Sequence, residues 1–351
     1  MRLIKPSYEI WKQPSGFEGM LEHIERVGRI CYKSEGNIKY DECGNSLTAE
    51  PFVQRLIKSG HGAMLEHGTV YLAIPFKYID ISAKLEIPIV SDVVEKYKGS
   101  PYTKWHLRDD GFSQLAFITT NYRVLVENGW LDDLKYLCEP TEYHEKRITV
   151  HFVCDRGVSH EFVRHRVFSF AQESTRYCNY SNKDKFGNEL TFIIPCWLNI
   201  IEGYYEIPGF WDNKTCREVS KMAGDKAKYT QIQSYLSAIG ISEMNYLELI
   251  KEGWKPQQAR VVLPNALKTE LVMTGFVDDW WGEYLVIDKT TGLVDQIIHG
   301  KFYDKLNNID RDKYRIVEKG FFPLRCSNGA HPQAQELAKP LHEEFIKNGW
   351  L

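Results

Sequence analysis

The sequence predicts an α+β fold in which a small mixed or antiparallel sheet is flanked by long helices. Residues 147–154 place their apolar side chains at every second position, which is the period of a half-buried strand. The stretch 211–254 is rich in helix formers, and its apolar residues recur at helical spacing. Hydrophobic residues make up 43% of the chain and charged residues 26%, which are ordinary globular proportions. At 351 residues the length allows two domains, but single domains with insertions also reach this size, and we expect one domain over residues 1–351.

The first part of the chain predicts two helices and a strand. Apolar residues at steps of three and four predict a helix over 17–31 and a second one over 48–60. The apolar run 69–74 then predicts a strand. Residues 75–145 are less regular, with a helical pattern over 122–137. We interpret 75–145 as an elaboration of the domain.

A strand, a turn and a helix are expected in the middle of the chain. The strand 147–154 leads into the turn Asp155-Arg156-Gly157, and Ser159 can cap the helix that follows. A further strand is expected over 191–194. The segment that follows the helix is therefore exposed in a loop, where its backbone can meet a ligand.

The last part of the chain is mostly helical in this interpretation, with one interruption. Helices are expected over 211–254, as two long helices that break near Gly240, over 268–280, and over 332–348. Residues 284–298 contain two strand-like runs around a Thr-Thr-Gly turn and predict a hairpin. The hairpin belongs to a charged stretch, 282–319, that has the character of an insertion.

Charge and cysteine usage limit the partners and the compartment. The net charge is −3, so the chain has no overall basic surface for nucleic acid or for an anionic membrane. The N-terminal residues lack an apolar signal core, and no run approaches ~18 apolar residues, so we expect a cytoplasmic protein. The eight cysteines are scattered without a two-residue spacing, which favours buried free thiols over a metal site.

The stretch Arg164–Tyr177 carries more hydrogen-bond donors than a core segment can satisfy internally. Arginine suits phosphate, and a shielded charge-assisted hydrogen bond contributes about 1.5–3 kcal/mol. Arg164 and Arg166 therefore suit a diphosphate. The alternative, equally open from residue types alone, is that these arginines form ion pairs within the chain. The acidic candidates are Glu161, Glu173 and Asp155.

A second polar group lies at His61-Gly62-Ala63-Met64-Leu65-Glu66-His67. Two histidines and a carboxylate could bind a metal, but histidines six residues apart do not share a helix face. We favour the interpretation that the turn brings His61 and Glu66 to a ligand as hydrogen-bonding groups. A buried histidine without a ligand role is the alternative for His61.

Four stretches in order resemble the flavin-dependent thymidylate synthases. The Arg164–Tyr177 stretch resembles the family signature, and His61 with Glu66 and His67 resembles its upstream histidine and Glu-His pair. Arg260-Val261-Val262-Leu263-Pro264 resembles its Arg-x-x-Leu-Pro, and Phe321–Arg325 its late aromatic-x-Leu-Arg. The resemblance implies an α+β homotetramer with FAD between subunits. It also implies that dUMP becomes dTMP, with methylenetetrahydrofolate as one-carbon donor and NADPH as reductant.

The resemblance assigns roles to individual residues. Arg325 would be catalytic, by polarising the uracil so that its carbon 5 becomes nucleophilic. The residues that would contact the cofactor are His61, Glu66, Arg164, His165, Arg166 and Gln172. Those that would bind dUMP are Glu161, Arg164, Gln172, Glu173, Ser174, Thr175, Arg176, Arg260 and Arg325.

The role implied for Arg325 is chemically sound, because stabilising negative charge on the uracil needs a cation that keeps its proton. A cysteine nucleophile is then unnecessary. Ser174 has no evident base beside it, so it suits a phosphate hydrogen-bond donor better than a nucleophile. The plainer alternatives are that Arg325 is a surface arginine and that Arg260 is a charge at a helix end.

The chain also departs from the family pattern. An Asn and an Arg that contact the flavin in the family correspond here to Phe276 and Asp278, and a carboxylate near a diphosphate is repulsive. The insertion 282–319 is a second departure. Two other functions therefore stay open: a related flavin enzyme that modifies another pyrimidine nucleotide at carbon 5, and a silent nucleotide-binding homologue.

Overall fold

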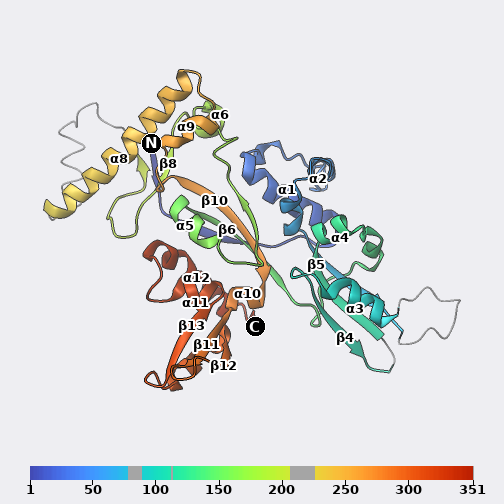
Figure 1. Ribbon diagram of the computed structural model, residues 1–351. Coiled ribbons are helices and arrows are strands. Elements are labelled where there is room, and N and C mark those ends of the chain that lie inside the picture. The colour runs from blue at the N-terminus through green and yellow to red at the C-terminus, as the bar shows by residue number, and fades with distance from the viewer. Residues whose placement is uncertain (78–88, 112–113, 206–225, 351) are drawn as a thin grey trace.

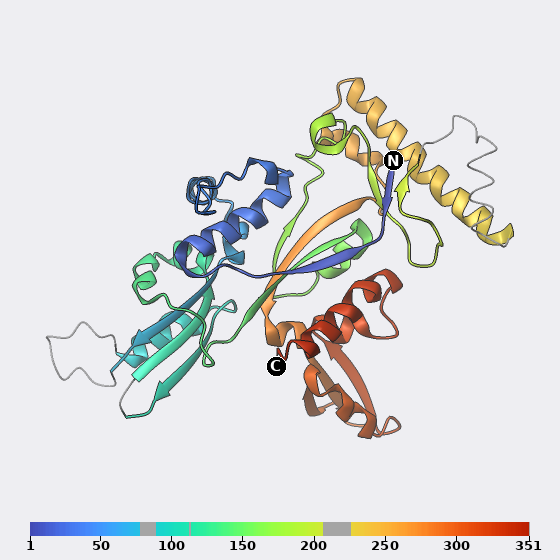
Figure 2. The same ribbon diagram turned by 180° about the vertical axis from the view of Figure 1, so that it is seen from behind.

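The computed structural model describes residues 1–77, 89–111, 114–205 and 226–350. It confirms the α+β class: helices and small, largely antiparallel sheets surround a central sheet, with lobes extending from it in Figures 1 and 2. Across these ranges, none of the helices combines the length and the apolar character that a membrane span requires.

The central sheet is antiparallel, with strand order β2-β6-β10-β7. The strands are β2 (Ser7–Trp11), β6 (Arg147–Asp155), β10 (Lys268–Phe276) and β7 (Ser169–Gln172). β6 and β10 pair along their whole length, from Lys268 opposite Asp155 to Phe276 opposite Arg147. The strand expected over 147–154 is therefore confirmed as β6, and its pairing with β10 is the longest in this sheet.

Both faces of the central sheet are covered. Val272 of β10 packs with Val27 and Ile30 of α1 (Gly16–Tyr32) on one face. On the other face, Leu271 and Met273 pack into an aromatic core with residues of α5 (Arg156–Phe162), α11 (Phe321–Cys326) and α12 (Pro332–Lys347). Figure 1 shows α1 and α12 on opposite sides of β10.

The helix expected over 268–280 is wrong, because this stretch forms β10 and the short helix α10 (Val277–Trp281). β10 is buried on both faces from Thr269 to Phe276, so polar and apolar residues do not alternate along this run of sequence. Such a run does not distinguish a buried strand from a helix by spacing alone. Tertiary pairing with β6 decides the outcome.

The N-terminal lobe contains α1 and the helix α2 (Ala49–Lys58), which confirm the two helices expected there. It also holds the antiparallel sheet β3-β5-β4. Its other elements are η1 (Glu35–Asn37), η2 (Gly62–His67), β3 (Thr69–Pro75), α3 (Val90–Lys98), β4 (Lys104–Asp109), β5 (Gln114–Asn121), α4 (Tyr122–Asn128) and η3 (Leu131–Tyr136). Much of the elaboration thus packs against β3, in one apolar core with α1 and α2. The helical pattern over 122–137 is divided between α4 and η3.

A second lobe contains the long helix α8 (Lys226–Lys251) and a small sheet of order β8-β1-β9. Its other elements are β1 (Arg2–Ile4), α6 (Lys183–Phe186), β8 (Thr191–Ile193), β9 (Gly203–Tyr204), α9 (Pro256–Ala259) and η4 (Arg260–Val262). The expected break near Gly240 is wrong, because α8 runs through it. Ile239 and Tyr246 anchor the helix in the core of this lobe, and such packing outweighs the cost of about 1 kcal/mol for a helical glycine. The expected helix over 211–225 lies outside the described residues.

The C-terminal lobe contains the predicted hairpin, formed by β11 (Glu283–Asp288) and β12 (Val294–His299). β13 (Tyr314–Lys319) pairs with β11, after η5 (Gly300–Asn308). The two ends of this segment meet at glycines: a Cβ on Gly320 would lie 2.3 Å from the Cα of Gly282. The chain therefore leaves α10 and returns at almost the same point to start α11, which is the geometry of an insertion.

An aromatic core fixes α11 against α5. Trp280 and Phe321 are fully buried, with ring centroids 4.9 Å apart, and Phe162 of α5 lies 5.0 Å from Phe321. Edge-to-face packing of this kind contributes about 0.5–1.5 kcal/mol per pair beyond the burial of area. Arg325, one helical turn after Phe321, is thereby held beside the end of α5.

A polar layer lies inside the opposite face of the sheet. His67 Nδ1 lies 2.7 Å from Thr274 Oγ1, Thr149 Oγ1 lies 2.8 Å from the same atom, and His23 Nε2 lies 3.2 Å from Thr149 Oγ1. Burial, followed by the charges of Arg26 and Arg147, lowers the pKa of His23 to about 3. Burial also lowers the pKa of His67 well below its usual value. Both histidines are neutral in the folded chain.

These two histidines predict acid sensitivity. The unfolded chain binds their protons with pKa values near ~6.5, whereas the folded chain excludes them. Their contribution to stability is thus complete above about pH 6.5. It falls as the pH drops below that value, by up to ~1.4 kcal/mol per pH unit for each histidine. Urea unfolding between pH 7.5 and 5.5 measures this slope.

Replacing His23 with Asn removes one of the histidines whose pKa the fold lowers, so the slope should decrease by up to one proton. Leu56→Ala, in the core of the N-terminal lobe, is the control, because it should lower stability equally at every pH. An unchanged slope in the His23→Asn variant would show that folding does not lower the pKa of His23.

Candidate functional site

The helix α5 positions the arginine-rich stretch. Asp155 caps it, because its side chain accepts a hydrogen bond of 2.7 Å from the backbone N–H of Val158. The expectation that Ser159 is the cap is wrong: Ser159 lies inside the helix and donates to the carbonyl of Arg156. Asp155 directly precedes the first residue of the helix, so its carboxylate occupies the N-cap position. α5 ends at Phe162, so residues 164–166 follow in an irregular segment, as expected.

Arg164 and Arg166 are exposed and form no ion pair with any described acidic residue. The alternative of internal pairing is wrong, because the three candidate carboxylates have other partners. Glu161 binds Arg325, Glu173 binds Lys268, and Asp155 binds Gln333 and the α5 backbone. The two guanidinium groups therefore retain their donors for an anion.

Arg325 lies in a cluster with Glu161 and His165, which precede it by more than 150 residues. Its Nη1 donates to Glu161 Oε2 at 2.6 Å, and its Nη2 donates to the backbone carbonyl of Glu161 at 2.7 Å. Its Nε donates to His165 Nε2 at 2.9 Å. Burial, with the charge of Arg325, lowers the pKa of His165 to about 3. His165 is therefore a neutral acceptor.

Gln172, at the end of β7, connects the strand to its neighbours. Its Nε2 donates to Ser159 Oγ of α5 at 2.8 Å and to Thr269 Oγ1 of β10 at 3.2 Å. This side chain fixes α5 against the central sheet. It lies on the same face of β10 as the aromatic core.

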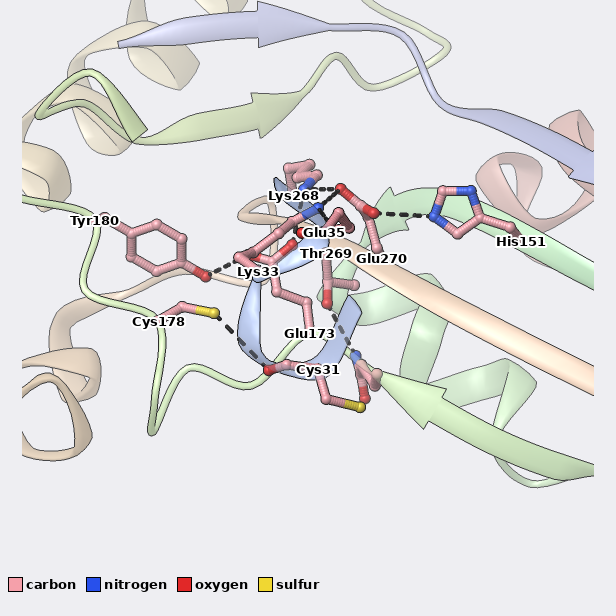
Figure 3. Close-up of polar contacts among 11 residues, drawn as sticks. Cys31, Lys33, Glu35, His151, Glu173, Cys178, Tyr180, Lys268, Thr269 and Glu270 are labelled. Atoms are coloured by element: carbon pink, nitrogen blue, oxygen red, sulfur yellow. Dashed lines mark hydrogen bonds and ion pairs between the residues drawn. The ribbon is translucent and has the colours of Figure 1, made fainter. Parts of the chain in front are cut away.

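Glu173 belongs to a buried charged network, shown in Figure 3. Its carboxylate accepts from Lys268 Nζ at 2.7 Å and from Tyr180 Oη at 3.0 Å, and the residue is 2% exposed. Lys268 also binds Glu270, which pairs with Lys33 at the end of α1. His151 Nε2 completes the network 3.0 Å from Glu270 Oε2.

The charges in this network stabilise one another. Burial alone would raise the pKa of Glu270, but the hydrogen bond from His151 and the charges of Lys268 and Lys33 hold it well below its usual range. Burial likewise opposes the charge of Lys268, yet Glu173 and Glu270 raise its pKa. Glu173 is thus committed to protein partners. It anchors the segment that follows it.

That segment meets the Arg-x-x-Leu-Pro stretch. Ser174 donates its backbone N–H to Cys31, at the end of α1, and its hydroxyl oxygen accepts from the backbone N–H of Arg176. Arg260 Nη1 lies 3.4 Å from Thr175 Oγ1. Arg176 and Arg260 are both exposed. The fold therefore brings two exposed arginines, 84 positions apart, to one loop.

His61 and Glu66 lie at the 3-10 helix η2, which packs against α1 and β7. His61 is exposed, and Glu66 Oε1 accepts from Arg123 Nη1 at 2.5 Å. The adjacent His67 contacts Thr274, on the α1 face of the sheet. Arg325 packs on the other face. The described contacts of one chain therefore do not join the η2 pair to the Arg325 cluster.

Phe276 and Asp278 are built into the scaffold. Phe276 is 2% exposed, with Lys104 Nζ 5.0 Å from its ring centroid. Asp278 forms ion pairs with Lys104 of β4 at 2.8 Å and with His299 of β12 at 3.2 Å. Asp278 thereby ties the elaboration and the insertion to α10. Neither side chain offers a donor to a diphosphate.

A cavity of about 1010 Å³ opens beside α5. Gly157, Val158 and Glu161 form one wall, and the loop with Trp197, the start of α8 and Gln333 form others. Among the described residues that line it there is no lysine or arginine, so an anionic group suits the exposed Arg164 and Arg166 better than this cavity. Glu161 is shared by the cavity and the Arg325 cluster.

Lys268, Glu270, Lys33 and His151 were missed by sequence reasoning. A signal was present: Lys268 and Glu270 are charged residues two positions apart, directly before the apolar residues 271–273, and this spacing places both on one face of a strand. The helical interpretation of 268–280 concealed it. Within the residues that the structure describes, no three potential metal-ligating side chains gather into a site.

Comparison with known proteins supports the resemblance over part of the chain. Residues 140–282 match the family model described as thymidylate synthase complementing protein. A flavin-dependent thymidylate synthase of Mycobacterium marinum is 30% identical over 127 residues, which are 36% of this chain and 42% of that protein. The proteins of the same description from Mycobacterium bovis and Mycobacterium tuberculosis are 31% identical over 127 residues, again 36% of this chain and 42% of each relative. The chain thus matches less than half the length of these relatives.

A solved structure adds one further likeness. A UMP/dUMP methylase from Streptomyces cacaoi, bound with 5-Br dUMP, is 14% identical and has a TM-score of 0.35 over 99% of this chain and 93% of that one. The family match includes Arg164–Arg176 and Arg260. His61, Glu66 and Arg325 lie outside it, so their assignment depends on the motifs alone.

The buried network predicts the effect of removing its shared cation. Lys268→Met leaves Glu173 buried without a counter-charge and should lower the free energy of unfolding by about 3–5 kcal/mol. Lys319→Met is the matched control, because the Lys319–Glu283 pair is exposed and contributes at most about 1 kcal/mol. Urea unfolding followed by circular dichroism gives both values.

The double variant Lys268→Met, Glu173→Gln removes the isolated charge as well as its partner. It should recover part of the stability that Lys268→Met loses. Equal losses in Lys268→Met and in the exposed control would contradict the role of the network.

Proposed function

We propose that this chain is a flavin-dependent thymidylate synthase. It would methylate dUMP to dTMP, with methylenetetrahydrofolate as one-carbon donor and NADPH as reductant. The observation that carries the proposal is the Arg325 cluster: Arg325, the predicted uracil-polarising arginine, contacts Glu161 of α5 and His165 of the signature segment. The family match over residues 140–282 supports the same assignment.

Arg164 and Arg166 fit an anionic cofactor, because both are exposed and unpaired among the described residues. FAD, when bound, supplies the reducing electrons for the new methyl group. The two arginines would hold its diphosphate. Phe276 and Asp278 offer no donor to the diphosphate. In this proposal Arg164 and Arg166 therefore bind the anionic part of the cofactor without them.

The nucleotide would lie near the loop of Ser174 and Thr175. Arg176 and Arg260, both exposed beside that loop, would bind its phosphate. Arg325 would then stabilise the negative charge that develops on the uracil. Glu173 takes no part in this contact, because its carboxylate is occupied by Lys268 and Tyr180.

The described cysteines near these segments are poor nucleophiles. Burial raises the pKa of Cys31 to about 11, of Cys178 to about 12 and of Cys326 to about 12. Thiolate is the reactive form, and at neutral pH these groups stay protonated. This supports a mechanism in which Arg325 activates carbon 5 without a covalent bond to a cysteine.

The proposal includes a cytoplasmic homotetramer with sites shared between subunits. His61 and Glu66 lie with η2 on the α1 face of the sheet, whereas Arg325 lies on the other. A second copy could supply the pair that one chain keeps apart. Exposed apolar side chains on and beside α8 support association: Ile241, Met244 and Val261 are 48%, 56% and 74% exposed.

A second candidate is a flavin enzyme that modifies another pyrimidine nucleotide at carbon 5. The ion pairs of Asp278 with Lys104 and His299 favour it, because they rebuild a position at which the family binds flavin. Comparing dUMP, UMP and dCMP as substrates decides between the two candidates. Turnover of UMP or dCMP in preference to dUMP would establish the second.

The proposal predicts a yellow protein that releases tritium from carbon 5 of labelled dUMP when given NADPH and methylenetetrahydrofolate. Arg325→Lys keeps the charge but loses the planar fork, and should lower kcat by about 10²–10³-fold. The flavin absorbance should persist in this variant. Arg315→Ala, on the exposed β13, is the control that should keep full activity.

A colourless protein that stays inactive with added FAD would overturn the proposal. Full turnover by Arg325→Lys would overturn the role of Arg325 alone, because another group would then polarise the uracil. Loss of flavin from Arg325→Lys would indicate a cofactor contact instead.

A further inference from the structure

We infer that Glu161 and His165 are positioning residues, which hold the guanidinium of Arg325 in one orientation. The resemblance implies instead that these two residues contact substrate and cofactor. The inference rests on the proposed function in one respect, because Arg325 is taken to act on the pyrimidine. The contacts that carry it belong to the chain itself.

The donors of Arg325 can be counted. A guanidinium has five N–H groups in a planar fork. His165 accepts the single Nε–H, the Glu161 carboxylate accepts one N–H of Nη1, and the Glu161 carbonyl accepts one of Nη2. Two N–H groups remain, one on each terminal nitrogen. Three contacts in one plane fix the orientation and leave two donors for a ligand.

Glu161 and His165, which together form the brace that holds Arg325, are themselves held rigidly. Glu161 lies in the last turn of α5, and one of its two contacts comes from the backbone. His165 is 7% exposed, and its ring centroid lies 5.2 Å from that of Phe321. Phe321 opens the helix that carries Arg325. The histidine therefore contacts both the core end of α11 and its functional side chain.

The brace also requires particular charges. His165 accepts from a cation, so it must be neutral, and burial with the charge of Arg325 keeps its pKa low. Glu161 supplies a counter-charge for an arginine whose side chain is 13% exposed. Without it, Arg325 would be a partly buried cation with Arg164 as a neighbouring like charge. Orientation and charge thus depend on the same two residues.

The conservative variants separate positioning from other roles. Glu161→Gln keeps an acceptor oxygen for Nη1, and His165→Gln offers one for Nε, whereas the alanine variants offer none. Glu161→Ala and His165→Ala should lower kcat by about 10–100-fold, because each loses one charge-assisted contact. The glutamine variants should recover much of that loss. The flavin spectrum should not change in any of the four.

A second measurement does not depend on activity. Phenylglyoxal modifies arginine, and peptide mass mapping gives the rate at Arg325 relative to the exposed Arg315 in the same sample. Arg325 should react slowly in the wild-type chain and several-fold faster in both alanine variants. His342→Ala is the matched control, because His342 packs on Phe322 of α11 without touching Arg325. It should leave the rate at Arg325 unchanged.

Parallel changes in labelling and kcat would support the inference. Unchanged labelling in both alanine variants would overturn it. So would loss of flavin from His165→Ala with Arg325 still protected, because His165 would then be a cofactor contact. A wild-type chain without flavin or turnover, in which labelling still responds to the variants, would overturn the proposed function and support the brace.

Discussion

The antiparallel pairing of β6 with β10 is the constraint on which the rest of the structure depends. It runs from Lys268 opposite Asp155 to Phe276 opposite Arg147. One end of the pair starts α5 and the buried charged network, and the other leads into α10 and the insertion. Because both faces of the sheet are covered, each side chain of β10 is directed into one of two separate cores. The same sheet separates the two groups of predicted site residues: His61 and Glu66 lie on the α1 face, and Arg325 lies on the other.

The candidate site combines fixed and free charges. Glu161, Glu173 and Asp155 are all bonded within the chain, whereas Arg164 and Arg166 are exposed and unpaired among the described residues. Buried charges need partners, so the internal carboxylates are neutralised by Arg325 and Lys268 or by hydrogen bonds. The exposed arginines keep donors for an anion. The carboxylates thus hold the site together, whereas Arg164 and Arg166 can bind a ligand.

The departures from the family pattern have a structural explanation. Asp278 does not confront a diphosphate, since it pairs with Lys104 of the elaboration and His299 of the insertion. The insertion itself starts and ends at glycines in contact, Gly282 and Gly320, so it extends the chain without displacing α10 from α11. The aromatic core around Trp280 is preserved across it. Arg325 can therefore keep its place despite the added segment.

The sequence by itself determined the α+β class, the helices α1, α2 and α12, the hairpin of the insertion and the exposed arginines of the signature, because amphipathic periods and turn residues are local properties. It did not determine that 268–276 is a strand, that α8 passes Gly240, or that Asp155 caps α5. A strand buried on both faces has no distinctive period, and packing decides its partner. Only the tertiary structure showed that Glu161 and His165 hold Arg325, because that contact joins residues 160 or more positions apart.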